Sequence, residues 1–163
     1  MSGTTTIPRL LPDDEAYALL ELTADIADRE LAPRASAFEE RGDFPRDLMR
    51  TLGRAGLLGL PYPVEFGGGG QPYEVFVQVV EELARRWLTV AEAVSVHTLA
   101  CYPIAAHGTD AQRERWLPDL IGGELLGAYC LSEPQGGSDP AAMTTRAARE
   151  GDELLLRGTK AWI

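Results

Sequence analysis

Apolar side chains recur at helical spacing along the first two-thirds of the chain. After Pro12, with Asp13 as the candidate N-cap, apolar positions fall three and four residues apart up to Leu31. This period is typical of a helix that buries one face. Pro33 is predicted to bend or interrupt the helix near its third quarter, because proline has no N–H to donate and clashes with the preceding turn.

The same periodicity predicts a series of further helices joined by short connections. A capping box formed by Thr109 and Gln112 marks the start of the last of them. The segment LLGLPYPVEFGGGGQP is rich in Pro and Gly and is expected to be irregular. Successive helices with short connections predict a bundle. The predicted ranges are 45–56, about 72–87, about 89–106 and 109–122.

The period changes from helical to alternating at Gly123. GAYCLSE (127–133) is expected to be a short apolar strand. The segment that follows is expected to form a hairpin around residues 150–152, then a turn at Gly158 and a new strand up to Ile163. The chain is therefore predicted to be α+β, with an all-α bundle first and strands after it.

Composition and charge narrow the classes of function. The 163 residues are 45% hydrophobic and 25% charged, as in a globular protein, with a net charge of -10. Such a charge argues against nucleic acid or an anionic membrane as the partner, since both attract clustered Lys and Arg. No uninterrupted apolar run approaches the roughly 18 residues of a membrane span. The first residues resemble neither a signal nor a transit peptide, so a cytoplasmic location is expected.

The cysteines and histidines show no ligand pattern, so no metal site is predicted. Cys101 and Cys130 lie far apart outside any CxxC motif, and both are expected to be small buried thiols. His97 and His107 are ten residues apart, which is not a helical ligand spacing. A structural role is expected for each, with His107 in the last turn of its helix.

Other candidate motifs favour structure over chemistry. GGGG at 67–70 lacks the Lys-Ser/Thr of a phosphate-binding loop, so a turn is expected there. Ser132 and Ser138 do not lie in a GxSxG nucleophile motif. Glu133 and Asp139 could form an acid–base pair, but capping or ion pairing is favoured, because Pro134 and a turn separate them. No catalytic set is apparent from spacing alone.

Several motifs in register nevertheless resemble the acyl-CoA dehydrogenase family. That family shows a strand followed by Thr or Ser and Glu-Pro, a Gly-Ser-Asp turn, a Thr-x-Ala segment and Gly-x-Lys-x-Trp-Ile. Ser132 departs from the more frequent Thr but keeps the hydroxyl. The matching segments here are PYPVEFGGGG (61–70), HGTDAQRERWLPDLIGGE (107–124), SEP (132–134), GSD (137–139), TRA (145–147) and GTKAWI (158–163).

The resemblance implies a helical N-terminal domain over 1–123, followed by the first strands of an antiparallel β-barrel domain over 124–163. It also implies that FAD lies against the second part. The Ser132 hydroxyl would donate to the polar edge of the flavin, and the low loop at Gly136 and Gly137 would let phosphates or pantetheine pass close. Ser138 would contact both FAD and the acyl-CoA substrate. The residues implied at the cofactor are Tyr129, Cys130, Leu131, Ser132, Gly137, Ser138, Trp162 and Ile163.

The implied reaction converts an acyl-CoA into a trans-2-enoyl-CoA, with electrons passed to an electron-transferring flavoprotein. The family's catalytic base is a glutamate in a C-terminal helical domain, so no residue of this sequence is expected to be catalytic and the 163-residue chain is expected to be inactive. A homotetramer or homodimer is expected at full length. The alternatives are a flavin oxidase or monooxygenase on the same scaffold, and a non-catalytic helical binding module.

Overall fold

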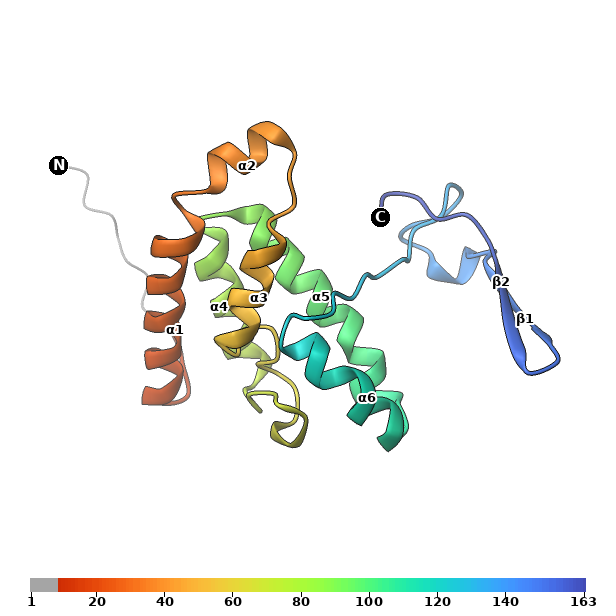
Figure 1. The fold of residues 1–163 in the computed structure, drawn as a ribbon, viewed down its shortest axis with the longest axis horizontal. Coiled ribbons are helices and arrows are strands. Elements are labelled where there is room, and N and C mark those ends of the chain that lie inside the picture. The colour runs from red at the N-terminus through yellow and green to blue at the C-terminus, as the bar shows by residue number, and fades with distance from the viewer. Residues whose placement is uncertain (1–8) are drawn as a thin grey trace. The chain divides into compact units, whose positions relative to one another are not determined.

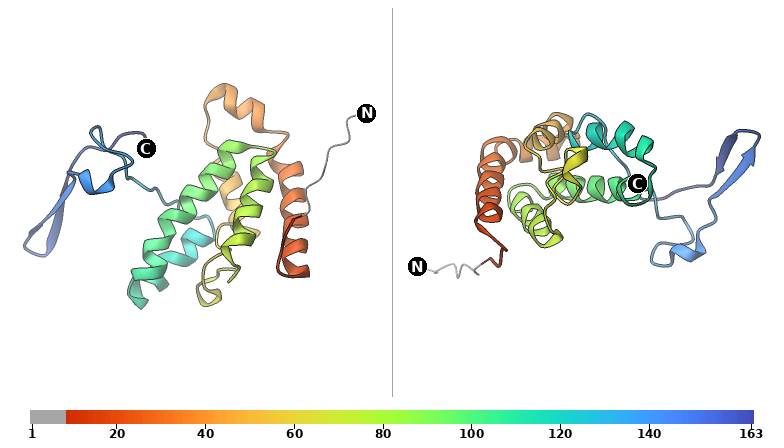
Figure 2. Two further views of the ribbon diagram at one scale, coloured as in Figure 1. Left: turned by 180° about the vertical axis from the view of Figure 1, so that it is seen from behind. Right: turned by 90° about the horizontal axis from the view of Figure 1, so that it is seen from below.

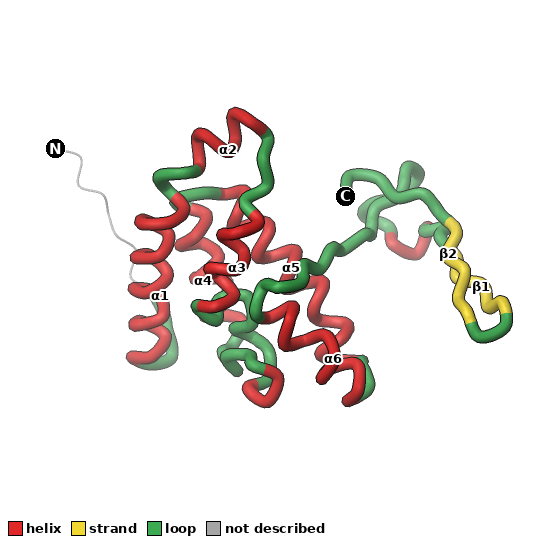
Figure 3. Tube along the Cα trace, viewed as in Figure 1, coloured by secondary structure: helices red, strands yellow, loops and turns green. Residues whose placement is uncertain are grey.

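The computed structural model describes residues 9–163. The chain divides into two compact units, and the division falls between Gly127 and Ala128. The first unit is helical and the second contains a β-hairpin (Figures 1 and 3). Each unit is described by itself below.

Within the described residues, the first unit contains six α-helices and two short helical turns of other types. The bundle is easiest to follow in the two further views of Figure 2. The α-helices are α1 (Asp14–Ile26), α2 (Ala35–Arg41), α3 (Arg46–Arg54), α4 (Tyr73–Ala84), α5 (Leu88–His107) and α6 (Asp110–Ile121); the turns are η1 (Ala27–Leu31) and η2 (Val64–Phe66).

The first predicted helix begins as expected and is interrupted before Pro33. The Asp13 carboxylate accepts a hydrogen bond from the backbone N–H of Ala16 at 2.9 Å, which confirms the N-cap. After Ile26 the backbone widens into the π-helical turn η1, where the N–H of Ala32 donates to the carbonyl of Ala27 at 2.9 Å. The wider turn keeps Leu31 buried in the core before the chain turns toward α2.

The last helix confirms the predicted capping box. The Thr109 hydroxyl accepts from the N–H of Gln112 at 3.3 Å, and the Gln112 side chain accepts from the N–H of Thr109 at 2.8 Å. Both bonds satisfy N–H groups that have no partner inside the helix. The helix ends at Gly122, as the predicted range 109–122 has it, and Gly123 follows with a φ of 79°.

The backbone of α3 lies directly against the turn that ends α6. A Cβ added to Gly53 would lie 2.3 Å from the carbonyl oxygen of Gly122, and one added to Gly123 would lie 2.7 Å from that of Met49. The Arg46 guanidinium joins the same two segments by donating to the carbonyls of Gly123 and Glu124. Glycine at these positions permits an approach that any side chain would block.

The hydrophobic core joins α1, α3, α4 and α5. Each fully buried Leu or Val in this main core contributes about 1.5–3 kcal/mol relative to an exposed one. The buried side chains of these four helices therefore supply most of the stabilisation of the bundle. A smaller cluster of Tyr62, Cys101, Leu117, Leu120 and Ile121 lies between α5 and α6. The main core includes Leu20, Leu31, Leu48, Leu52, Val79, Leu83, Val90 and Val94.

Helix α5 is central in the bundle, because it packs against α4 and also against α6. By length and composition alone it is also apolar enough to cross a membrane. Core helices of globular proteins share that property. The inward face of α5 buries Val90, Val94, His97 and Cys101 within the bundle.

The second unit contains the predicted hairpin. Strands β1 (Arg146–Glu150) and β2 (Glu153–Arg157) pair antiparallel, with Arg146 opposite Arg157 and Glu150 opposite Glu153. Gly151 adopts the positive φ of 64° that the two-residue turn requires. Both faces of the hairpin are exposed, including Leu154 and Leu156 at 62% and 71%. A hairpin of this kind packs no core of its own.

Two predicted strands are wrong within this chain. Residues 127–132 and 159–163 form no strand ladder in the described part of the chain. Their backbones meet in a single bond, from the N–H of Ala161 to the carbonyl of Ser132 at 2.9 Å. A strand is defined by a paired neighbour as well as by its own pattern, and an alternating sequence cannot supply that neighbour. The turn predicted at Gly158 is also wrong, since residues 158–163 have no turn. The glycine there is explained by close approach, because a Cβ would lie 2.1 Å from the Thr145 hydroxyl oxygen.

Candidate functional site

A tight turn brings the predicted hydroxyl and the predicted glycine loop together. The N–H of Glu133 donates to the carbonyl of Gly136 at 2.8 Å, and the N–H of Gly136 returns a bond of 3.0 Å. Pro134 occupies the first central position of this turn, where its fixed φ is favourable. A Cβ built on Gly137 would lie 3.8 Å from the Ser132 hydroxyl oxygen, so the two residues are neighbours.

The Glu133 carboxylate accepts hydrogen bonds from several segments of the second unit. The residue is only 4% exposed. One of its oxygens accepts from the N–H and the hydroxyl of Thr144 at 2.7 and 2.9 Å, and also from the Gln135 amide. The other accepts from the N–H of Thr145 and from the Lys160 ammonium, each at 3.0 Å. A carboxylate with this many donors has all its lone pairs satisfied.

These donors keep Glu133 ionised. The Thr145 hydroxyl, the backbone N–H of Thr144 and the Lys160 ammonium hold the pKa of this carboxyl well below its usual range, against an opposing effect of burial. Among the described residues, no group forms a hydrogen bond with the buried Thr145 hydroxyl. An enclosed carboxylate with a lowered pKa and several fixed donors is suited to holding structure rather than to exchanging protons.

Glu133 and Asp139 therefore have the structural roles that were favoured over an acid–base pair. Glu133 forms an ion pair with Lys160. Asp139 caps the short helical turn η3 (Pro140–Ala142), where its carboxylate accepts from the N–H of Ala141 at 3.1 Å.

Lys160 joins the two segments that carry most of the predicted cofactor contacts. Its ammonium donates to the carbonyl of Leu131 at 3.1 Å as well as to Glu133, and it contacts the Met143 sulfur at 3.5 Å. Together with the Ala161–Ser132 backbone bond, this holds residues 131–133 beside 160–161.

The remaining predicted contact residues lie at the surface of the second unit. Trp162 is 96% exposed, and its φ of 60° is the only positive value found for a non-glycine residue in the described part of the chain. Tyr129 and Ile163 are 40% and 66% exposed. Leu131 and Ser132 are half-buried, whereas Gly137 and Ser138 are exposed. The structure thus joins Ser132 to Gly137 and to the 160–161 segment. It records no contact that draws Ser138 or Tyr129 into this group.

The expectation of two buried cysteines is half wrong. Cys101 is buried beside His97, and loss of hydration raises the pKa of its thiol to about 12. Cys130 is exposed, and the segment around it forms no strand.

His97 has the structural role expected of it. It is 1% exposed; its Nε2 donates to the carbonyl of Leu120 at 2.9 Å, and its Nδ1 accepts from the N–H of Gly127 at 3.0 Å. Burial lowers the pKa of His97, an effect that the nearby Arg46 reinforces and the Leu120 carbonyl opposes. His107 lies in the last turn of α5, as predicted.

The GGGG segment is a turn whose N–H groups are already used. The N–H groups of Gly68, Gly69 and Gly70 donate to the carbonyls of Pro63, Gly59 and Tyr62 at 2.9–3.0 Å, and that of Gln71 donates to Leu60 at 2.7 Å. A phosphate-binding loop requires such groups to point at the ligand.

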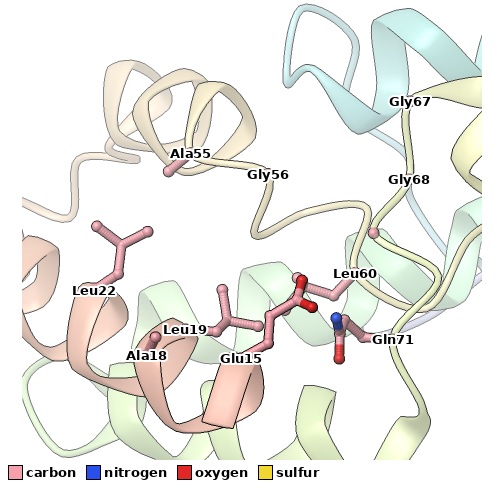
Figure 4. Close-up of a pocket in the computed structure, with 11 residues that line it drawn as sticks. Glu15, Ala18, Leu19, Leu22, Ala55, Gly56, Leu60, Gly67, Gly68 and Gln71 are labelled. Atoms are coloured by element: carbon pink, nitrogen blue, oxygen red, sulfur yellow. The ribbon is translucent and has the colours of Figure 1, made fainter. Parts of the chain in front are cut away.

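Gly67, Gly68 and Gly69 line a cavity of about 390 Å³ beside α1, shown in Figure 4. The cavity wall is mainly apolar, with Leu19, Leu22 and Leu60 in it, and its charged member is the Glu15 carboxylate. An anion in this cavity would be repelled by the Glu15 carboxylate, so the cavity does not support a phosphate-binding site at the GGGG segment.

Sequence reasoning missed the connecting role of Lys160 and Thr144. In the sequence, Lys160 was noted only as one position of the Gly-x-Lys-x-Trp-Ile motif, and no contact was predicted for its side chain. A usable signal was present, because Lys160 is the only lysine in a chain whose other basic side chains are all arginine. Among residues 9–163, no three of His, Cys, Asp and Glu gather in a way that could hold a metal ion.

The chain is similar to known proteins over most of its length. Residues 13–124 match the model of the acyl-CoA dehydrogenase N-terminal domain. An acyl-CoA dehydrogenase of Bacillus subtilis is 33% identical over 150 residues, which cover 91% of this chain and 40% of that protein.

Solved structures agree with this likeness. A glutaryl-CoA dehydrogenase of Mycobacterium smegmatis in complex with FADH2 superposes with a TM-score of 0.87 at 30% identity, covering 93% of this chain and 39% of that one. A structure described as the electron transferring flavoprotein of Acidaminococcus fermentans superposes with a TM-score of 0.87 at 28% identity, covering 93% and 40%. The chain spans about 40% of the length of the relatives it matches. The sequence motifs, the helical unit and the matched family model lead to one conclusion: the chain belongs to the acyl-CoA dehydrogenase family.

Proposed function

We propose that this chain forms the N-terminal part of an FAD-dependent acyl-CoA dehydrogenase, which converts an acyl-CoA thioester into a trans-2-enoyl-CoA. The electrons pass to an electron-transferring flavoprotein. The observation that carries the proposal is the Ser132 hydroxyl, which follows the family's motif, lies beside Gly137 and forms no hydrogen bond within the described residues.

The residues present fit a flavin. Among the described residues, no partner hydrogen-bonds to the Ser132 hydroxyl, although the main chain of Ser132 is held by Ala161. Neither Gly136 nor Gly137 has a positive φ, and a Cβ on either would meet its neighbours at ordinary contact distances of 3.5–3.8 Å. The chain's own packing therefore does not require glycine at these positions. An external group that approaches the backbone closely accounts for it.

The exposed Trp162 supports the same reading. In the proposal this side chain lies against the isoalloxazine ring, with Ile163 next to it.

The chain's residues would bind and orient rather than exchange protons. FAD supplies the two-electron acceptor that takes a hydride from the β carbon of the substrate. Ser132 donates a hydrogen bond at the polar edge of the flavin, where negative charge grows on reduction. Tyr129, Cys130 and Leu131 would offer their backbone to the same edge, and Ser138 would contact both FAD and the CoA thioester. The base that removes the α proton lies outside this chain.

The proposal is tested on the longest product of the gene that carries this sequence. Purified protein is expected to show the visible absorbance bands of bound flavin. Those bands should bleach anaerobically when a panel of straight and branched acyl-CoAs is added. Reoxidation should be fast with an electron-transferring flavoprotein and slow with air. A protein without flavin, or one whose flavin no acyl-CoA bleaches, contradicts the proposal, and rapid reoxidation by air indicates an oxidase.

A further inference from the structure

Two segments far apart in the sequence are held together at one point of the second unit. Residues 129–133 and 160–163 carry most of the proposed flavin contacts. Within this unit they are linked by one backbone bond, from Ala161 to Ser132, and by the Lys160 side chain. Both segments lack the ladder of bonds that would fix the register of two paired strands. Their relative position therefore depends on these few bonds.

The Lys160 ammonium lies among three acceptors. It is within 3.1 Å of the Leu131 carbonyl and 3.0 Å of the Glu133 carboxylate, with the Met143 sulfur at 3.5 Å. Its side chain is 23% exposed and that of Glu133 is 1% exposed, so water competes little for these bonds. A compact ammonium with three rotatable donors suits acceptors that surround one point, whereas a planar guanidinium suits acceptors that lie side by side. The choice of lysine in an otherwise arginine-only chain agrees with this geometry.

Glu133 extends the connection to a third segment. The same carboxylate that binds Lys160 accepts from the N–H groups of Thr144 and Thr145, immediately before β1. An enclosed carboxylate without a cation would be costly, so neither partner is expected to keep its position alone.

We propose that Lys160 and Glu133 are positioning residues that hold the 129–132 segment against the 160–163 segment, so that the Ser132 hydroxyl and the Trp162 ring meet the flavin as one surface. This inference rests on the proposed function. The two side chains act through their neighbours, because their polar atoms are committed to one another, to the Leu131 carbonyl and to the N–H groups of Thr144 and Thr145.

The experiment has one measurement that does not depend on FAD. In the 163-residue chain, amide hydrogen exchange of Ala161 reports the bond to Ser132 directly. Lys160→Met keeps the length of the side chain and removes the ammonium, and it is expected to speed exchange at Ala161 at least tenfold. Glu133→Gln removes the carboxylate charge and should do the same. The double variant should be no worse than the more damaging single one, since both changes break one connection.

The second measurement is FAD affinity in the longest product of the gene, followed by flavin fluorescence. Lys160→Met and Glu133→Gln are each expected to raise the Kd for FAD at least tenfold and to alter the visible circular dichroism of bound flavin. Arg157→Met is the matched control, because it removes a cation from an ion pair with Glu150 in the same unit, where the side chains are 75% and 62% exposed. The control should match the parent in both measurements.

Two results would overturn the positioning role of Lys160 and Glu133. Unchanged exchange at Ala161 in Lys160→Met overturns the positioning role, and so does faster exchange with an unchanged Kd for FAD. Far-UV circular dichroism identifies a variant that fails to fold, in which case Glu133→Gln decides by the same two criteria. A parent protein that binds no FAD overturns the proposed function and the inference with it.

Discussion

The buried His97 provides the sharpest test of how the helical unit is held together. Its ring connects three segments, since it lies on α5, donates to the last turn of α6 and accepts from the backbone N–H of Gly127. His97→Phe keeps a ring of similar size and removes both polar atoms. The Leu120 carbonyl retains a bond from the N–H of Gly123 at 3.0 Å, so the greater loss falls on Gly127.

The expected magnitude follows from these contacts. Two neutral hydrogen bonds contribute about 0.5–1.5 kcal/mol each, and the half-buried N–H of Gly127 loses its partner. We expect His97→Phe to lower the free energy of unfolding by about 2 kcal/mol, which corresponds to a fall in Tm of roughly 4–8 °C for a chain of this size.

The difference should also depend on pH. Burial lowers the pKa of His97 in the folded state below the value of about 6.5 in the unfolded state. Between these two values the unfolded chain binds more protons, so the parent loses stability as the pH falls below about 6.5 and retains it in full above. The phenylalanine variant lacks this dependence. The gap between parent and variant should therefore narrow from pH 7.5 toward pH 5.

The assay is urea unfolding of the 163-residue chain, followed by far-UV circular dichroism across that pH range. His107→Phe is the matched control, because the same substitution is made on the same helix at an exposed position. It should change stability by less than about 0.5 kcal/mol. If His97→Phe unfolds at the same urea concentration as the parent, with an unchanged gap across pH, the structural role assigned to His97 is refuted.

Three further predictions address other parts of the chain. Gly53→Ala places a Cβ 2.3 Å from the Gly122 carbonyl oxygen, so it should cost about 1–3 kcal/mol in urea unfolding; a variant as stable as the parent would mean that α3 and the end of α6 do not touch. In the longest product of the gene, Ser132→Ala should weaken FAD binding by about 1.5–3 kcal/mol, the contribution of a hydrogen bond to a charged group, whereas Ser132→Thr should bind as the parent does; equal affinities for both would mean that the hydroxyl does not bond the flavin. Limited proteolysis of the 163-residue chain should cut the exposed segment 146–157 first and leave the helical unit, and mass spectrometry showing first cuts inside α4 or α5 would contradict this.

Local features were predicted well because their partners lie within a few residues. The Asp13 cap reaches Ala16, and the Thr109–Gln112 box closes on itself over one turn. The hairpin around Gly151 follows from a two-residue turn with a positive φ. Each of these depends on backbone groups that a reader of the sequence can already place.

Tertiary structure decided the features whose partners are distant. The strands expected over 127–133 and 159–163 are absent, because neither finds a ladder partner in the described chain. The exposure of Cys130 and the close approach of Gly53 to Gly122 depend in the same way on what lies opposite.

The candidate site also contains residues that the sequence motif predicted and residues that only the tertiary structure revealed. The motif indicated Ser132, the glycine turn and Trp162, because these residues share one sequence pattern. It did not show that Glu133 gathers Thr144, Thr145 and Lys160 around one carboxylate. Glu133 and Lys160 are 27 positions apart in the sequence, and their ion pair depends on the path of the chain in space. The separation of two residues along the sequence does not give the distance between them in the folded chain.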